Sequence, residues 1–222
     1  MFKLEEILNI LSMLILISAF ILVANKRVNS YIKTFRLQSM LLAAAAGTLG
    51  IYHMAAERKF DSAIIMCLLI ILLKVIFIPG MLNRICKRVE YKVEKDFFIN
   101  IPISIIICCG LAILVWYVIS LIPDIKGAYE IMFLTNSISL VMIGLFFMIS
   151  RKKAIGQIIG FLVIENGMFM AALLTTFGMP MIVEIGIFFD VLAAVLIMGV
   201  FVFRINESFD SIDIDKLRNL RG

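Results

Sequence analysis

Long apolar segments alternate with short polar segments along the whole chain. Seven apolar segments are long enough to cross a membrane as helices, since such a helix needs about 20 mostly apolar residues. They lie at about 5–24, 37–56, 62–81, 97–121, 129–149, 154–175 and 181–203. Strands of a membrane barrel would be about half as long and would alternate in polarity. The pattern therefore predicts an all-α, polytopic membrane protein with seven transmembrane helices.

Composition supports a membrane protein and argues against a nucleic-acid partner. Hydrophobic residues make up 63% of the chain, whereas a typical soluble domain is about half apolar. The formal net charge is +5, but the basic residues lie in short clusters between the apolar segments rather than along one face. We therefore expect the lipid bilayer, and not nucleic acid, to surround the chain.

The basic clusters predict an orientation in the membrane. Loops that face the cytoplasm carry an excess of Lys and Arg. The first, third and fifth loops (25–36, 82–96 and 150–153) and the C-terminal tail are basic, and the other loops are poor in basic residues. The alternation predicts an external N-terminus, a cytoplasmic C-terminus and a multi-pass location in the inner (cytoplasmic) membrane.

Two acidic residues interrupt the last two apolar segments. Glu165 lies 11 residues beyond Ala154, which places it about 16 Å into the sixth segment, and Asp190 lies nine residues, about 14 Å, beyond Met181 in the seventh. Both positions are near the middle of a bilayer core of about 30 Å. Burial there disfavours the ionised form, so such groups can take up and release protons. The sequence predicts a proton-transfer pair on adjacent antiparallel helices, with hydrogen-bonded packing as the alternative.

Lys74 is the third candidate for proton transfer. It lies inside the third apolar segment, five residues before Pro79, which can kink the end of the helix. The lysine extends its ammonium to the headgroups, has a pKa lowered by burial, or pairs with a buried carboxylate. Four further polar residues are secondary candidates, with interhelical hydrogen bonding or a place at the membrane interface as the alternatives: His53, Glu184, Asn166 and Asn136.

Catalytic and cofactor-binding motifs are missing from the sequence. It contains no phosphate-binding loop, no nucleophile elbow and no zinc-binding HExxH motif, and it has a single histidine. We therefore expect no catalytic residues, no cofactor and no metal in this chain.

Several segments resemble one known family. The stretches "RKKAIGQIIGFLVIENGMFMAALL", "PMIVEIGIFFDVLAAVLIMGVFVFRINESFD", "IDKLRNLRG" and "LLKVIFIPGML" resemble component E of hydrogenase-4, a membrane subunit of formate hydrogenlyase-type complexes. The last three apolar segments are similar to the K-type subunit of respiratory complex I. That subunit has Gly-Leu-Glu in its second span, whereas here Gly160 is followed by Phe161 and Leu162, and the acid comes about one turn later at Glu165. Asp190 stands at the place of the second acid.

The resemblance implies a non-catalytic subunit of a proton-translocating nickel–iron hydrogenase complex. Its partners would be antiporter-like and core membrane subunits and the hydrogenase peripheral arm, and the nickel–iron centre and iron–sulfur clusters would lie in partner subunits. It also implies three regions: four N-terminal helices at 1–128, a K-type-like region at 129–205 and a cytoplasmic tail at 206–222. Two other readings stay open, a subunit of a multisubunit Na⁺/H⁺ antiporter and a structural spacer between larger membrane subunits.

Overall fold

The fold is a bundle of long helices. In this computed structural model the structure describes residues 2–57, 67–88, 99–123, 127–175 and 199. The secondary structure of these residues is helical, as the sequence predicts. The elements in chain order are α1 (Phe2–Ala24), α2 (Val28–Glu57), a π-helix η1 (Ile71–Phe77), α4 (Ile78–Arg88), α5 (Ile101–Ser120), α6 (Ala128–Ser150) and α7 (Ala154–Thr175).

Five helices among the described residues are long and apolar enough to cross a membrane. They are Leu4–Ala24, Cys67–Arg84, Ile101–Ser120, Ala128–Ser150 and Ala154–Leu173. The second predicted segment also forms a helix, but α2 is not among the five, and its buried side carries Thr34, Gln38 and Ser39. The predicted segment 181–203 lies outside the described residues apart from residue 199. The all-helical, multi-pass architecture is confirmed, whereas the count of seven spans, the orientation and the division at residues 128 and 205 stay predictions.

Helices extend into two of the predicted loops, so the predicted bounds of these loops are wrong. The first connection is only 25–27, because α2 already begins at Val28. One face of this first part of α2 is buried and carries Tyr31, Ile32 and Phe35. Lys33 and Arg36 are exposed. Apolar residues at this spacing make an amphipathic helix, whose buried face stabilises it beyond the apolar segment. Likewise α4 continues to Arg88 and so contains the first half of the predicted third loop.

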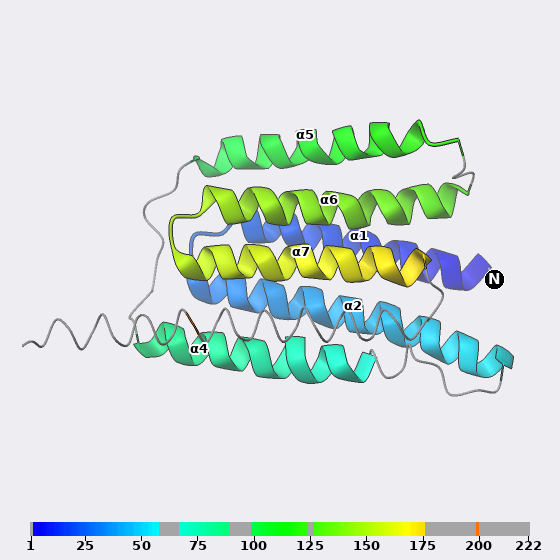
Figure 1. Cartoon of the computed structure of the whole chain (residues 1–222), viewed down its shortest axis with the longest axis horizontal. Coiled ribbons are helices and arrows are strands. Elements are labelled where there is room, and N and C mark those ends of the chain that lie inside the picture. Colours follow the sequence, from blue (N-terminus) through cyan, green and yellow to red (C-terminus); the bar gives the residue numbers. More distant parts are fainter. Residues whose placement is uncertain (1, 58–66, 89–98, 124–126, 176–198, 200–222) are drawn as a thin grey trace, which may run out of the picture.

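The helices form two packed pairs with one helix on each flank. Helix α6 packs along α7 and α1 along α2, and the pairs meet through α1 against α6 and α2 against α7. Figure 1 shows α5 on one flank, beside α6, and α4 on the opposite flank, beside α2. The two short connections, 25–27 and 151–153, lie at the same end of the bundle. The start of α1, the start of α6 and the end of α7 lie at the other end (Figure 1). This arrangement agrees with the prediction that the first and fifth loops share one side of the membrane.

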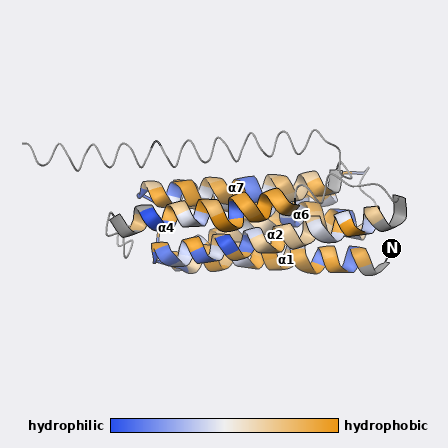
Figure 2. Cartoon of the chain, turned by 90° about the horizontal axis from the view of Figure 1, so that it is seen from below, coloured by the Kyte–Doolittle hydropathy of each residue, from blue (hydrophilic) through white to orange (hydrophobic). Residues whose placement is uncertain are grey.

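Apolar residues cover the outside of the bundle, and many polar residues lie inside it. Figure 2 shows that hydrophobic residues predominate along the helices. Ile106, Ile113 and Ile149 are 69%, 66% and 66% exposed, which suits a surface covered by lipid tails. Fifteen of the described polar or charged side chains are buried instead: Ser12, Ser18, Thr34, Gln38, Ser39, Lys74, Ser104, Thr135, Asn136, Ser137, Ser139, Ser150, Arg151, Glu165 and Asn166.

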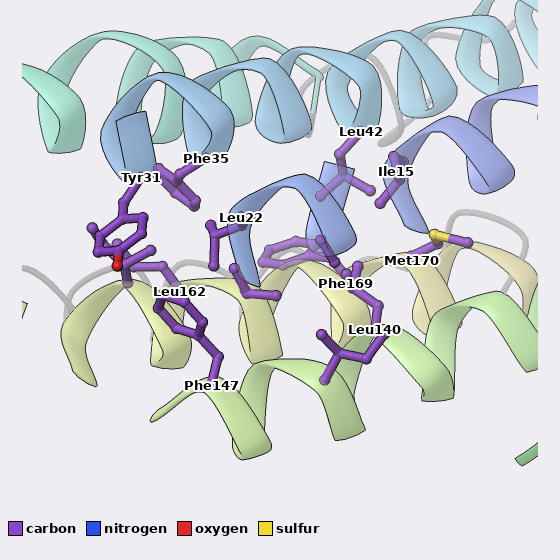
Figure 3. Close-up of a cluster of buried hydrophobic side chains, with 14 of the residues drawn as sticks. Ile15, Leu22, Tyr31, Phe35, Leu42, Leu140, Phe147, Leu162, Phe169 and Met170 are labelled. Atoms are coloured by element: carbon purple, nitrogen blue, oxygen red, sulfur yellow. The ribbon is translucent and has the colours of Figure 1, made fainter. Parts of the chain in front are cut away.

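The central helices share an apolar core at several levels. Its buried side chains point toward one another from α1, α2, α6 and α7 in Figure 3, including Ile15, Leu22, Phe35, Leu42, Leu140, Phe147, Leu162 and Met170. At one end of this core the rings of Tyr31 and Phe147 meet edge to face, with centroids 5.3 Å apart, a favourable arrangement of aromatic quadrupoles.

Glycines bring α6 and α7 into close contact. A Cβ atom added to Gly160 would lie 2.8 Å from backbone atoms of Met148, and one added to Gly144 would lie 2.8 Å from the backbone nitrogen of Ile164. At Gly167 the nearest atoms would belong to Val141 and to the carbonyl of Ser137, at 2.7 Å and 3.0 Å. Small residues let membrane helices approach in this way, so that dispersion contacts hold them together. Small side chains also lie on the buried side of α2, where Ala43, Ala45 and Ala46 are buried.

Candidate functional site

Lys74 lies in a widened turn of the membrane-spanning helix Cys67–Arg84. The π-helix Ile71–Phe77 surrounds it, and the N–H of Ile78 donates to the carbonyl of Leu73, five residues earlier. Pro79 follows at once; it has no N–H to donate, and its ring collides with the carbonyl four residues before it in a regular α-helix. The π turn relieves that collision, and π turns of this kind are frequent at functional sites. The sequence analysis expected Pro79 to distort the helix end, and the distortion lies at the turn that carries Lys74.

The Lys74 ammonium meets a carboxylate, an amide and an aromatic ring inside the bundle. Its Nζ lies 3.2 Å from Glu165 Oε1 and donates to Asn166 Oδ1 at 3.2 Å. The same Nζ lies 4.2 Å from the ring centroid of Phe169, within the range of a cation–π contact. Lys74, Glu165 and Asn166 are all 0% exposed. Lys74 is therefore paired with a buried carboxylate and does not extend to the headgroups, while its role in proton transfer stays a prediction.

Hydrogen bonds continue from Asn166 across α2 to α1. The Asn166 amide Nδ2 donates to Gln38 Oε1 at 3.0 Å and to Ser39 Oγ at 3.4 Å. Gln38 Nε2 in turn donates to Ser18 Oγ at 3.0 Å and to the carbonyl of Ile15 at 3.4 Å. Ser18 Oγ donates to the same carbonyl at 2.6 Å. The polar network therefore joins four elements of the bundle, from α1 through α2 and α7 to η1.

The site lies at mid-depth and away from solvent. Glu165 is 11 residues from the start of α7 at Ala154 and 10 from its end at Thr175, or about 15 Å from either end. Removing a charge from water costs several kcal/mol per ion, and a pair offsets this cost only with close contact and further hydrogen bonds. The ring and the amide supply those contacts for Lys74. A network that costs this much is a candidate for function, because ionisable groups inside membranes mark ion and proton pathways.

The other predicted site residues have different outcomes. Asn166 is part of the site around Lys74. Asn136 lies on α6 and donates instead to Ser12 Oγ on α1 at 2.8 Å. His53 lies on α2, but its side chain is outside the described part of the structure. Asp190 and Glu184 lie outside the described residues, so the proximity of Asp190 to Glu165 stays a prediction.

Gln38, Ser39 and Ser18 complete the network, although the sequence did not predict them as site residues. The pair Gln38–Ser39 stands inside the second apolar segment, and polar side chains there form hydrogen bonds between helices. That signal was available, but the partners of each side chain depend on how the helices pack.

Arg151 also has a role that the sequence analysis did not predict. It was counted as a basic loop residue, yet it is only 2% exposed. Its Nη2 donates to the carbonyl of Val23 at 2.9 Å, and its guanidinium lies 4.4 Å from the ring centroid of Phe147 and 5.4 Å from that of Tyr31. A cation is favoured at a helix C-terminus, where carbonyls lack helical partners. Arg151 therefore ties the end of α1 to the connection between α6 and α7.

A metal site is not evident in the described part of the chain. No group of three or more His, Cys, Asp or Glu side chains there could hold a metal ion. The four cysteines, Cys67, Cys86, Cys108 and Cys109, are free thiols. Burial raises the pKa of Cys86, which lies beyond the apolar span, to about 11, so its thiol stays protonated and is a poor metal ligand.

The fold and the site together define a class of membrane protein. The chain is a multi-pass helical bundle with a lipid-facing apolar surface and a charged pair at mid-depth. A family model described as NADH-ubiquinone/plastoquinone oxidoreductase chain 4L matches residues 132–222, which cover most of α6, all of α7 and the rest of the chain. Such a chain is a membrane subunit of a multisubunit respiratory-type complex.

Similar proteins identify the family. The chain is 32% identical over 166 residues to the uncharacterized protein Rv0085 of Mycobacterium tuberculosis, a match that covers 74% of this chain and 76% of that protein. It is 21% identical over 218 residues to hydrogenase-4 component E of Escherichia coli and of Shigella flexneri, with 97% of this chain and 98% of each relative covered. The chain belongs to the hydrogenase-4 component E family. No solved structure shows significant similarity to it.

Proposed function

We propose that the chain is a non-catalytic subunit of a proton-translocating nickel–iron hydrogenase complex in the inner membrane. In this proposal Glu165, Lys74 and Asp190 form part of the route by which protons move through the membrane arm. The observation that carries it is the fully buried ion pair of Lys74 and Glu165, 3.2 Å apart and joined by amides to α1. A spacer between larger subunits has no need of charges that are this costly to bury.

The geometry suits a group that gains and loses a proton. A proton that reaches Glu165 neutralises its carboxylate and weakens the attraction to Lys74. The ammonium keeps its bond to Asn166 Oδ1 and its contact with the Phe169 ring, so the lysine stays in place while the carboxyl passes the proton on. The redox chemistry, with nickel, iron and iron–sulfur clusters, belongs to partner subunits in this proposal.

Isolation of the complex tests the assignment. An affinity tag on this chain, followed by extraction in a mild detergent, is expected to recover antiporter-like subunits, core membrane subunits and the hydrogenase large and small subunits, identified by mass spectrometry. Binding to neighbouring subunits favours the folded chain by mass action, so we expect it to be stable only in their company. Antiporter subunits without any hydrogenase subunit would favour a cation/proton antiporter instead, and a stable, functional monomer would contradict both readings.

The orientation is tested separately. We expect the N-terminus on the external side and the C-terminus in the cytoplasm, since the basic connections at 25–27 and 151–153 share one end of the bundle. Fusions to alkaline phosphatase, which is active outside, and to green fluorescent protein, which is fluorescent inside, report the side of each terminus. Both termini on one side would rule out an odd number of spans.

A further inference from the structure

The hydrogen bonds between Lys74 and α1 have a fixed direction. An ammonium has donors and no acceptor, so the atom of Asn166 that faces Lys74 at 3.2 Å is the carbonyl oxygen Oδ1. The amide nitrogen Nδ2 then points away from Lys74. It donates to Gln38 Oε1 at 3.0 Å and to Ser39 Oγ at 3.4 Å. The charge of Lys74 thus determines which way the Asn166 amide is turned.

The same direction is set independently from the other end, on α1. The backbone carbonyl of Ile15 can only accept, and Ser18 Oγ donates to it at 2.6 Å. This hydroxyl has used its single proton, so it offers lone pairs to Gln38. Gln38 Nε2 donates to it at 3.0 Å and to the Ile15 carbonyl at 3.4 Å. The oxygen Oε1 of Gln38 is therefore turned toward Asn166, as the other end also requires.

Reversal of either amide would bring like groups face to face. A turned Asn166 would point its N–H groups at the Lys74 ammonium and its oxygen at Gln38 Oε1. Lys74, Gln38 and Asn166 are 0% exposed and Ser18 is 1% exposed, so bulk water does not reach the groups that would lose their partners. Such buried donors and acceptors are costly. Gln38 stands in the middle of the series, and the orientation of Asn166 depends on it.

This branch of the network does not itself carry protons. A proton relay needs groups that accept one proton while they release another, and the carboxamides of Gln38 and Asn166 do neither near neutral pH. The branch ends instead in a fixed acceptor at the Lys74 ammonium. Glu165 Oε1 lies 3.2 Å from the same ammonium, so the groups that hold the ammonium also set the charge that the carboxylate meets.

We propose that Gln38 is a positioning residue for proton transfer at Glu165. It acts through Asn166: by accepting from Nδ2 it holds Oδ1 against Lys74, and so it keeps the ammonium beside the carboxyl group whether or not Glu165 carries a proton. This inference rests on the proposed proton-transfer function of Glu165. Gln38 neither takes up nor releases a proton, and its contribution is the direction of one amide.

A change at Asn166 provides the test, because Asn166→Asp removes the need for positioning. Both oxygens of a carboxylate accept hydrogen bonds, so one faces Lys74 in either orientation. Gln38→Met, which keeps the length of the side chain without the amide, is introduced into the natural complex and into the Asn166→Asp complex. In the natural complex we expect proton translocation per assembled complex to fall about tenfold, the effect of a lost hydrogen bond to a charged group.

The same substitution is expected to matter little once both oxygens at position 166 accept. In the Asn166→Asp background Gln38→Met should lower translocation less than about twofold, because the two changes act on one interaction and their effects are not additive. Equal fold losses in both backgrounds would show that Gln38 only fills space and would overturn the proposal.

The state of Glu165 is measured separately with dicyclohexylcarbodiimide, which modifies protonated carboxyl groups inside membranes. Mass spectrometry follows the adduct on the Glu165 peptide over time, so the measurement does not need proton movement. An ammonium in contact keeps a carboxylate ionised. Glu165 should therefore react several-fold faster in Gln38→Met than in the natural complex, and no faster in Asn166→Asp/Gln38→Met than in Asn166→Asp. Equal rates with and without Gln38 in the natural background would overturn the proposal.

Two further variants serve as controls. Gln157→Met makes the same chemical change at an exposed glutamine of α7 outside the network, and should leave translocation and the modification of Glu165 unchanged. Ser39→Ala removes only the longer of the two bonds that Asn166 donates, so it should cost less than Gln38→Met. A loss in Gln157→Met as large as that in Gln38→Met would count against positioning.

The positioning role and the proposed function fail in different ways. Full translocation by Glu165→Gln refutes the proposed function. Unchanged translocation and an unchanged rate of modification in Gln38→Met, beside an inactive Glu165→Gln complex, refute only the positioning role.

Discussion

Replacing Glu165 by glutamine is expected to abolish proton translocation by the complex, while electron transfer from an artificial donor to the hydrogenase continues. Glutamine has nearly the shape of glutamic acid and can accept a hydrogen bond from Lys74, but it cannot take up or release the proton. The measurements are the proton uptake of inverted membrane vesicles, the hydrogenase activity with a dye donor and the amount of assembled complex. Asp190→Asn, which rests on the sequence prediction alone, is expected to behave alike.

A double variant separates proton transfer from a structural role of the ion pair. Glu165→Gln leaves the Lys74 ammonium, and Lys74→Met leaves the Glu165 carboxylate, without the opposite charge 3.2 Å away. Breaking a buried pair on one side costs about 3–5 kcal/mol, whereas replacing both charges by groups of similar size is often neutral. We therefore expect reduced assembly in each single variant and restored assembly in Lys74→Met/Glu165→Gln, with no proton translocation in any of them.

The controls decide what the pair does. Glu6→Gln makes the same chemical change at an exposed position on α1 and should leave assembly and translocation unchanged. If the pair only holds helices together, the double variant regains translocation together with assembly. Normal translocation by the double variant would therefore refute the proton-transfer role of Glu165.

Alanine at Gly160 and Gly167 is expected to disrupt the packing of α6 on α7. The added Cβ atoms would lie 2.8 Å from the Met148 backbone and 2.9 Å from the Val141 backbone nitrogen, and backbone atoms cannot move aside as a flexible side chain can. Overpacking of this kind costs about 1–3 kcal/mol per site. We expect the double variant Gly160→Ala/Gly167→Ala to lower the melting temperature of the extracted complex and the amount of chain in the membrane. Because α7 also carries Glu165, translocation should fall with assembly.

Gly110→Ala is the matched control for the glycine prediction. Gly110 lies in the middle of α5, and a Cβ atom there would meet nothing within 4 Å. Alanine is the better helix former by about 1 kcal/mol, so this variant should be at least as stable as the natural chain. Equal melting temperatures for Gly110→Ala and Gly160→Ala/Gly167→Ala would show that α6 and α7 do not depend on their close approach.

The apolar pattern was enough to predict most helices, because length and continuous hydrophobicity are set by the bilayer. The predicted segment 154–175 has the bounds of α7, and 129–149 is within one residue of α6 at either end. The start of α2 was missed, since Tyr31 and Phe35 extend that helix through burial against neighbouring helices rather than through continuous hydrophobicity. Helix ends outside the apolar segments therefore depended on packing.

The sequence by itself also singled out Glu165 and Lys74, because a charged residue inside an apolar segment is costly wherever its side chain points. It could not determine that Lys74 pairs with Glu165, that Asn166 and Gln38 connect the pair to α1, or that Arg151 is buried at the end of α1. Most of these contacts join residues about 90 to 130 positions apart in the chain, and Gln38 reaches Ser18 across 20 positions. Only the packing of the helices decides them, because which face of each helix turns inward depends on the glycine contacts of α6 and α7 and on the π turn before Pro79.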